Sequence, residues 1–222
     1  MSLRMTPDDI PIVLGRLRKA ARAWRVPSVS QVGMDGRDPF RVLVACVLSL
    51  RTRDETTGPA AARLFALADR PQALARLSPR AIERAIYPVG FYRTKARTLR
   101  DLAWRLIEKH GGKVPDSIEA LLAIKGVGRK TANLVVTVGF GKPGICVDTH
   151  VHRISNRWGL VRTKTPEKTE FALREILPRR HWISYNDLLV AFGQRVCRPL
   201  SPRCSACPVG DRCPRLGVKR SR

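Results

Sequence analysis

Four cysteines near the C-terminus have the spacing of a metal-binding segment. Cys197, Cys204, Cys207 and Cys213 follow one another as C-x6-C-x2-C-x5-C. Thiolates so close in sequence can surround one metal centre, and the spacing fits either Zn²⁺ or an iron–sulfur cluster. Because the segment has almost no apolar residues of its own, we expect the metal to hold it folded.

Disulfides and free thiols are the alternatives for these cysteines. Asp8 and Asp9 interrupt the N-terminus, and no long apolar run follows, so no secretory signal is visible. No run of about 18 apolar residues could cross a membrane. We therefore expect a cytoplasmic protein without membrane contact, whose cysteines stay reduced. Four free thiols in so short a segment would have no evident use.

The stretch Ile124–His150 contains a candidate anion site, Lys125-Gly126-Val127-Gly128, between two predicted helices. Glycines permit positive φ and close approach to the backbone. The N–H groups that open a helix lack intrahelical partners and attract anions. We predict that Gly126, Val127 and Gly128 hold a phosphate, with Lys125 and Arg129 beside them. Many helix hairpins turn on glycine without binding anything, so the motif alone is weak.

Lys130 and Asp148 are the candidates for covalent chemistry. Lys130 would lie in the first turn of a helix, where the helix dipole favours the neutral, nucleophilic amine. The simpler alternative is a solvated lysine that contacts phosphate. Asp148 precedes another predicted helix and can be an N-cap worth about 1 kcal/mol, a catalytic carboxylate, or both. His150 can contact phosphate or pack within the helix, and packing is favoured.

The charge of the chain favours nucleic acid as its partner. The 222 residues carry a formal net charge of +24, and the pI is about 11.2. Such a charge opposes compaction and suits a polyanion, although an anionic membrane surface or a well-solvated exterior are alternatives. Arg198, Arg203 and Arg212 lie within or beside the cysteine segment. Arg198 and Arg203 are candidate phosphate contacts, or these arginines offset the charge of the thiolates.

Apolar residues recur at helical spacing along most of the chain, and strand signals are weak. This pattern predicts helices at 9–24, 39–50, 54–68, 79–86, 94–110, 148–158, 165–177 and 181–196. Pro39–Leu50 is apolar nearly all round, which predicts a buried central helix with Cys46 in the core. Val135–Val138 is β-branched, but it is predicted to continue the helix that follows the glycine turn.

Local signals predict where some elements begin. Asp54 is the predicted N-cap of the helix that ends at Ala68. Pro115 and Asp116 are predicted to open a helix before the glycine turn, and Val26–Gly36 is predicted to be a loop.

Several motifs together resemble the endonuclease III family, the bifunctional DNA glycosylases of the helix-hairpin-helix superfamily. The main ones are GVGRKTAN (126–133), VDTHVHRISNR (147–157) and the cysteine segment. The likeness also includes LSLRTRDETT (48–57), VGFYRTKA (89–96) and GGKVPDSIEALLAIKGVG (111–128), and it covers roughly residues 30–215. Each motif is modest alone, but their order and spacing are specific.

The resemblance implies an all-α fold of two helical domains with a DNA-binding cleft between them. Residues 32–142 would form a six-helix domain with the helix-hairpin-helix motif, and residues 1–31 plus 143–222 would form an iron–sulfur domain. The four cysteines would hold a [4Fe–4S] cluster, and Lys130 and Asp148 would face each other across the cleft. The implied partner is double-stranded DNA with damaged bases or abasic sites. We expect a monomer that associates with the nucleoid.

The resemblance also implies a reaction. The enzyme would flip a damaged pyrimidine out of the DNA stack. Lys130 would attack C1′ of the sugar, displace the base and form a Schiff base, and β-elimination would then nick the strand. Asp148 would activate Lys130 or stabilise positive charge on the sugar. Family substrates are oxidised pyrimidines such as thymine glycol, and abasic sites.

Lys130 separates this chain from the related adenine glycosylases, which generally lack a lysine at that position. Two other readings stay open. One is a monofunctional glycosylase that leaves the strand intact, and the other is a non-catalytic DNA-binding paralogue.

The chain departs from the family pattern at two positions. Arg51 stands where the family often has glutamine, in the loop that fills the gap left by the flipped base. Lys125 stands where the hairpin usually has proline. Phe91 matches the position of an apolar wedge that would unstack the duplex, and ordinary packing between helices is its alternative. Arg51, Phe91 and His150 complete the predicted DNA contacts.

Overall fold

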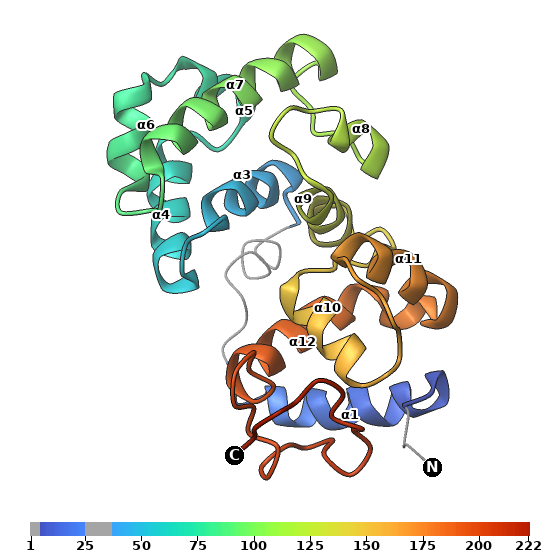
Figure 1. The fold of residues 1–222 in the computed structure, drawn as a ribbon. Coiled ribbons are helices and arrows are strands. Elements are labelled where there is room, and N and C mark those ends of the chain that lie inside the picture. Colours follow the sequence, from blue (N-terminus) through green and yellow to red (C-terminus); the bar gives the residue numbers. More distant parts are fainter. Residues whose placement is uncertain (1–4, 25–36) are drawn as a thin grey trace. The chain divides into compact units, whose positions relative to one another are not determined.

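The computed structural model describes residues 5–24 and 37–222, so the predicted loop Val26–Gly36 lies outside the described residues. Every regular element in the described ranges is helical (Figure 1), which confirms the all-α prediction. None of the helices in these ranges has both the length and the apolar character that a membrane span requires.

The chain divides into two compact units. The hairpin unit is Pro27–Gly144, and the cysteine unit combines Met1–Val26 with Ile145–Arg222. The domain limits predicted from the resemblance, 32–142 and the remainder, stay a prediction, because the first limit falls outside the described residues.

The hairpin unit is built around one buried helix. Its elements are α3 (Pro39–Ser49), α4 (Asp54–Leu67), α5 (Pro71–Arg76), α6 (Pro79–Ile86), α7 (Tyr92–His110), α8 (Ile118–Leu122), α9 (Arg129–Leu134) and the π-helical η2 (Val135–Gly139). Residues 42–48 of α3 are all buried, and α3 packs against α4, α7, α9 and η2. The central helix and the core position of Cys46 are therefore confirmed.

Two predicted helix starts in this unit are wrong. Asp54 is the first residue of α4, and Arg53 holds the N-cap position. The Asp54 carboxylate therefore lies inside the first turn, where it interacts favourably with the helix dipole. The helix expected from Pro115 or Asp116 begins only at Ile118. Ser117 caps it, because its hydroxyl accepts a hydrogen bond from the backbone N–H of Ala120 at 3.3 Å.

Two further differences concern short or shifted elements. The helix α5 was not predicted, because its six residues are too few to show a helical period. The helix α7 begins at Tyr92, two residues before the predicted start. Its end is as predicted, since Gly111 adopts φ 59° and terminates it.

The cysteine unit joins the two ends of the chain in one core. Its elements are η1 (Pro7–Asp9), α1 (Ile10–Ala21), α10 (Thr149–Arg157), α11 (Pro166–Ile176), η3 (Arg179–His181) and α12 (Trp182–Arg195). The helix α12 packs against α1 and α10, and Trp158, Tyr185 and Phe192 are fully buried in the shared core. Residues 196–222 continue without regular structure.

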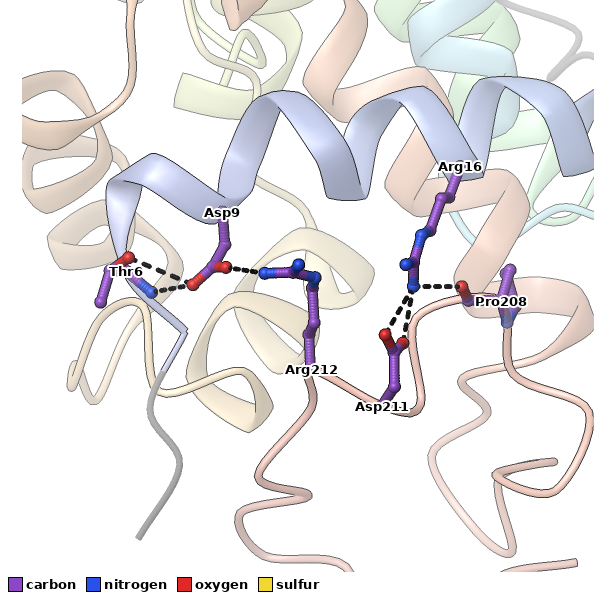
Figure 2. A network of polar contacts seen from close by, with 6 residues as sticks. All are labelled: Thr6, Asp9, Arg16, Pro208, Asp211 and Arg212. Carbon is purple, nitrogen blue, oxygen red and sulfur yellow. Dashed lines mark hydrogen bonds and ion pairs between the residues drawn. The ribbon is translucent and has the colours of Figure 1, made fainter. Parts of the chain in front are cut away.

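Two ion pairs connect α1 to this irregular C-terminal segment (Figure 2). Arg16 donates to both carboxylate oxygens of Asp211, at 2.7 and 2.8 Å, and Arg212 donates to Asp9. Asp9 also accepts from the backbone N–H of Thr6 at 3.0 Å. The N-terminal segment contributes the cation Arg16 and the anion Asp9, and the C-terminal segment contributes the anion Asp211 and the cation Arg212.

Candidate functional site

The glycine turn connects α8 to α9 in the hairpin unit. The N–H of Val127 donates to the carbonyl of Ile124 at 3.0 Å, which closes a four-residue turn. Gly126 holds the third position of that turn with φ 93°. Since a side chain disfavours positive φ, glycine is required there.

The second glycine has a different role. Gly128 is the N-cap residue of α9 and has φ −90°, which any residue can adopt. No heavy atom lies within 4 Å of the place where its Cβ would be. Lys125 and Gly126 are exposed as well, whereas the side chain of Val127 is buried. The turn therefore presents open backbone at the start of α9, where a helix offers N–H groups to an anion.

Replacing Gly126 by alanine is expected to lower the free energy of unfolding by about 1–2 kcal/mol, because the left-handed backbone is costly for a residue with a Cβ. Urea unfolding followed by circular dichroism measures the change. The matched control is Gly128→Ala, which we expect to leave stability unchanged. Equal stability of the two variants would contradict the assignment of strain to Gly126.

Lys130 is the second residue of α9, and its side chain is exposed. Arg129, which precedes it, is half-buried. The positive charge of Lys130 acts on Cys46 of α3, although burial dominates there and raises the pKa of the Cys46 thiol to about 12. The positive charge of Lys130 therefore extends to the central helix α3.

Asp148 belongs to the cysteine unit and caps α10. Its Oδ1 atom accepts hydrogen bonds from the backbone N–H groups of His150 and Val151, at 2.8 and 2.9 Å. The residue is only 8 % exposed. The predicted N-cap is confirmed, and it fixes the orientation of the carboxylate.

His150 lies against α12. A Cβ added to Gly193 of α12 would come within 2.3 Å of His150 Nδ1, so only glycine permits this approach. The Nη2 atom of Arg153 is 3.1 Å from the same nitrogen. This geometry supports the packing interpretation of His150.

Arg51 and Phe91 form a cation–π pair on the hairpin unit. The guanidinium carbon of Arg51 lies 5.7 Å from the centroid of the Phe91 ring. Both residues have a left-handed backbone, with φ 52° and 58°, which is uncommon for residues other than glycine. Phe91 is 62 % exposed, so the packing interpretation of Phe91 is wrong. Backbone strain beside an exposed aromatic ring points to a functional role.

The structure brings the four cysteines of the C-terminal segment together around one pocket. Three of them, Cys197, Cys207 and Cys213, also pack against the core of the cysteine unit. Burial is the main cause and the neighbouring thiols add to it, so that the pKa of Cys207 is raised to about 11. Four thiolates here therefore require compensating positive charge, as a metal centre supplies.

The donor set is compatible with two kinds of centre. A single zinc ion holds its thiolates at about 2.3 Å from one point, and an iron–sulfur cluster spreads its cysteines over several iron atoms. In the described part of the chain, no three His, Cys, Asp or Glu side chains are arranged to hold a single ion. Four cysteines lining one pocket are a set of ligands that either centre uses.

Two arginines of α10, which sequence analysis missed, support this pocket; Arg157 is buried and Arg153 is half-buried. Arg157 is 9 % exposed; it donates to Cys197 Sγ at 3.5 Å and to the carbonyls of Arg198 and Pro199 at 2.6 and 2.7 Å. Arg153 donates to the carbonyl of Cys197 at 2.7 Å. The available signal was the position of Arg157 on the apolar stripe of its helix, three residues after Ile154.

The arginines of the cysteine segment divide into two groups. Arg198 and Arg203 are exposed, as phosphate contacts require. Arg212 pairs with Asp9, so it connects the segment to α1 (Figure 2). The exposed pair and the glycine turn belong to different units of the chain.

Comparisons with known proteins give a consistent result. Residues 44–179 match the family described as "HhH-GPD superfamily base excision DNA repair protein". Endonuclease III of Thermotoga maritima is 51 % identical over 176 residues, which are 79 % of this chain and 83 % of that protein. Endonuclease III homolog 1, chloroplastic, of Arabidopsis thaliana is 41 % identical, and the match covers 79 % of this chain. The chain spans about half of the plant protein, 48 % of its length.

A solved structure extends the likeness to the fold. The structure of a trapped endonuclease III–DNA covalent intermediate, an estranged-adenine complex, matches with a TM-score of 0.81 and 34 % sequence identity. The match covers 94 % of this chain and 96 % of the other.

Proposed function

The chain belongs to the endonuclease III family of HhH-GPD base excision repair glycosylases, and we propose that it is a bifunctional DNA glycosylase and abasic-site lyase. Its substrates are double-stranded DNA with oxidised pyrimidines of the thymine glycol type, and abasic sites. The observation that carries the proposal is Lys130, an exposed amine directly after the glycine turn. The solved relative whose covalent intermediate with DNA was trapped supports it.

In the proposed reaction, the Lys130 amine attacks C1′ of the flipped nucleotide as the damaged base leaves with a proton. A proton then moves to O4′, the C1′–O4′ bond breaks and the sugar ring opens, so that the lysine nitrogen and C1′ are joined as a protonated Schiff base. This positive centre acidifies the 2′ hydrogen, and loss of that proton expels the 3′ phosphate by β-elimination. Nucleophilic catalysis of this kind divides one difficult displacement into easier steps.

Asp148 assists this chemistry in the proposal. Its hydrogen bonds to His150 N and Val151 N orient the carboxylate at the start of α10. A carboxylate so oriented can accept a proton from Lys130 or stabilise positive charge that develops on the sugar.

Replacing Asp148 by asparagine separates these roles. Asparagine caps helices about as well as aspartate, so the unfolding free energy should stay within about 0.5 kcal/mol of wild type. Base release and strand cleavage should fall by about 10²-fold or more, as for loss of a general base. Asp148→Ala should lose activity and about 1 kcal/mol of stability. Full activity of Asp148→Asn would remove the carboxylate from the mechanism.

The DNA contacts of the proposal lie on both units. Lys125, Gly126, Val127, Gly128 and Arg129 would bind phosphate at the glycine turn, and Arg198 and Arg203 would bind the backbone elsewhere. Arg51 and Phe91 would enter the duplex where the base leaves it, because an exposed ring and a planar guanidinium can each stack on the neighbouring bases. A protein that acts on chromosomal DNA would associate with the nucleoid.

We propose a [4Fe–4S] cluster as the metal centre. Cys197, Cys204, Cys207 and Cys213 would hold it, and it would maintain the fold of residues 196–222 when bound. The shared pocket of the four thiols and their support by Arg157 favour this assignment.

An activity panel tests the proposed function. Duplexes containing thymine glycol or an abasic site are incubated with the protein and borohydride, and also assayed with and without alkali. The proposal expects a covalent adduct and nicking without alkali. Nicking only after alkali would indicate a monofunctional glycosylase. Binding that is independent of damage, with no cleavage, would indicate a DNA-binding paralogue.

A further inference from the structure

Lys95 is a buried lysine within the hairpin unit. It lies in the first turn of α7, is 7 % exposed, and continues the apolar stripe formed by Leu99, Leu102 and Leu106. A lysine with its ammonium group left unpaired here would be strongly destabilising. Burial lowers its pKa to about 8, so the group remains mostly protonated at neutral pH.

The ammonium group of Lys95 has three partners, all uncharged oxygens. Its Nζ atom donates to the carbonyl of Leu48 at 2.8 Å, to the carbonyl of Leu50 at 2.5 Å, and to the Oγ1 atom of Thr52 at 3.0 Å. An ammonium has three donors, so this set saturates it. The carbonyls belong to the C-terminal end of α3, where the helix dipole favours a cation.

The partners of Lys95 flank one residue. Leu50 and Thr52 lie directly before and after Arg51, whose backbone is left-handed. Thr52 Oγ1 also accepts from the backbone N–H of Gly90 at 3.2 Å. A Cβ at Gly90 would come within 2.7 Å of the Arg51 carbonyl oxygen, so the two backbones are in close contact. The turn that carries Arg51 is thus fastened to the turn that precedes Phe91.

We propose that Lys95 is a positioning residue that holds Arg51 over the Phe91 ring, ready to enter the duplex. The proposal rests on the proposed function. The backbone conformations of Arg51 and Phe91 are unfavourable by themselves, because both residues have a positive φ. An apolar residue in place of Lys95 would fill the same space without desolvating a charge. It would leave the carbonyls of α3 without donors, and Arg51 would lose its fixed backbone.

The test compares Lys95→Met with wild type on two DNA substrates. Methionine has similar length and no donors. On a duplex containing thymine glycol, kcat/KM should fall about tenfold or more, a loss on the scale of hydrogen bonds to a charged group. On a single strand containing an abasic site, which has no gap to fill, cleavage should stay within about twofold. Lys109→Met, an exposed lysine of the same helix, is the matched control and should behave as wild type.

A spectroscopic measurement distinguishes positioning from folding. The DNA carries 2-aminopurine opposite a non-cleavable tetrahydrofuran abasic analogue, so that its fluorescence reports insertion beside the orphaned base. At saturating protein, Lys95→Met should produce a smaller fluorescence change than wild type, with a helical circular dichroism spectrum retained. Gly90→Ala displaces the Arg51 carbonyl while keeping the lysine, and should reproduce both effects. If Lys95→Met does not fold, the same measurements on Gly90→Ala test the proposal.

The outcomes separate the two proposals. If wild type cleaves neither substrate, the proposed function fails. If wild type is active and Lys95→Met retains duplex activity, loses activity equally on both substrates, or gives the full fluorescence change, the positioning role is refuted.

Discussion

Replacing Lys130 by alanine is expected to abolish the borohydride-trapped adduct and to lower strand cleavage by about 10³-fold or more. The reason is chemical. Alanine has no amine to attack C1′ or to form the Schiff base on which β-elimination depends. Gel electrophoresis of trapped protein–DNA adducts and of nicked oligonucleotides measures both effects.

The control for this result is Lys125→Ala. Lys125 is an exposed lysine five positions earlier, in the glycine turn that precedes α9. It should weaken DNA binding and reduce the dependence of binding on salt, as expected for one lost phosphate contact, while the adduct still forms. If the adduct persists in Lys130→Ala and disappears in Lys125→Ala, the nucleophile is Lys125 and the assignment to Lys130 is wrong.

Replacing Cys207 by serine is the second change with a large expected effect. The variant should lose the proposed metal centre and several kcal/mol of stability in the cysteine unit, since metal binding and folding of such a segment are coupled. Removal of the proposed iron–sulfur cluster from the wild-type protein should act in the same way. Iron and sulfide content, visible absorbance and urea unfolding together measure the loss.

Cys46→Ala is the matched control, because Cys46 is a buried cysteine of α3 in the other unit. It should retain the metal and lose only about 1 kcal/mol through a small cavity. Two results would contradict the cluster: a colourless protein with one equivalent of zinc, or a Cys207→Ser variant as stable as wild type.

Features with a strong local cause were predictable from the sequence. The central helix α3 followed from its apolar composition, and the N-cap at Asp148 followed from an aspartate directly before a periodic segment. Gathering of the four cysteines followed from their short spacing. In each case, nearby residues determine the structure without help from distant ones.

Features that depend on distant contacts were not predictable. Lys95 is a cation within an apolar stripe, and its partners lie more than forty residues earlier in the sequence. Arg157 likewise binds carbonyls about forty residues later. The helical period of apolar residues identifies Lys95 and Arg157 as charged residues on a buried face. It cannot identify the distant carbonyl oxygens that accept their hydrogen bonds and so compensate for their burial.

The catalytic residues illustrate a different limit. By composition alone, Lys130 is a solvated cation, and only the surrounding motifs indicate a nucleophile. Its exposure is compatible with both readings, so the adduct experiment is required to distinguish them.

The ion pairs between α1 and the C-terminal segment have a consequence for how the protein is made. About 160 residues separate the end of α1 from the start of α12, its packing partner, which corresponds to roughly ten to thirty seconds of synthesis. The segment of α1 leaves the ribosome early. It stays unfolded at that stage, because a basic helix of 12 residues is unstable alone. The contiguous hairpin unit can complete its core during that interval. The first residues of the cysteine unit therefore complete their folding last. They do so when Asp211 and Arg212 have been synthesised and pair with Arg16 and Asp9.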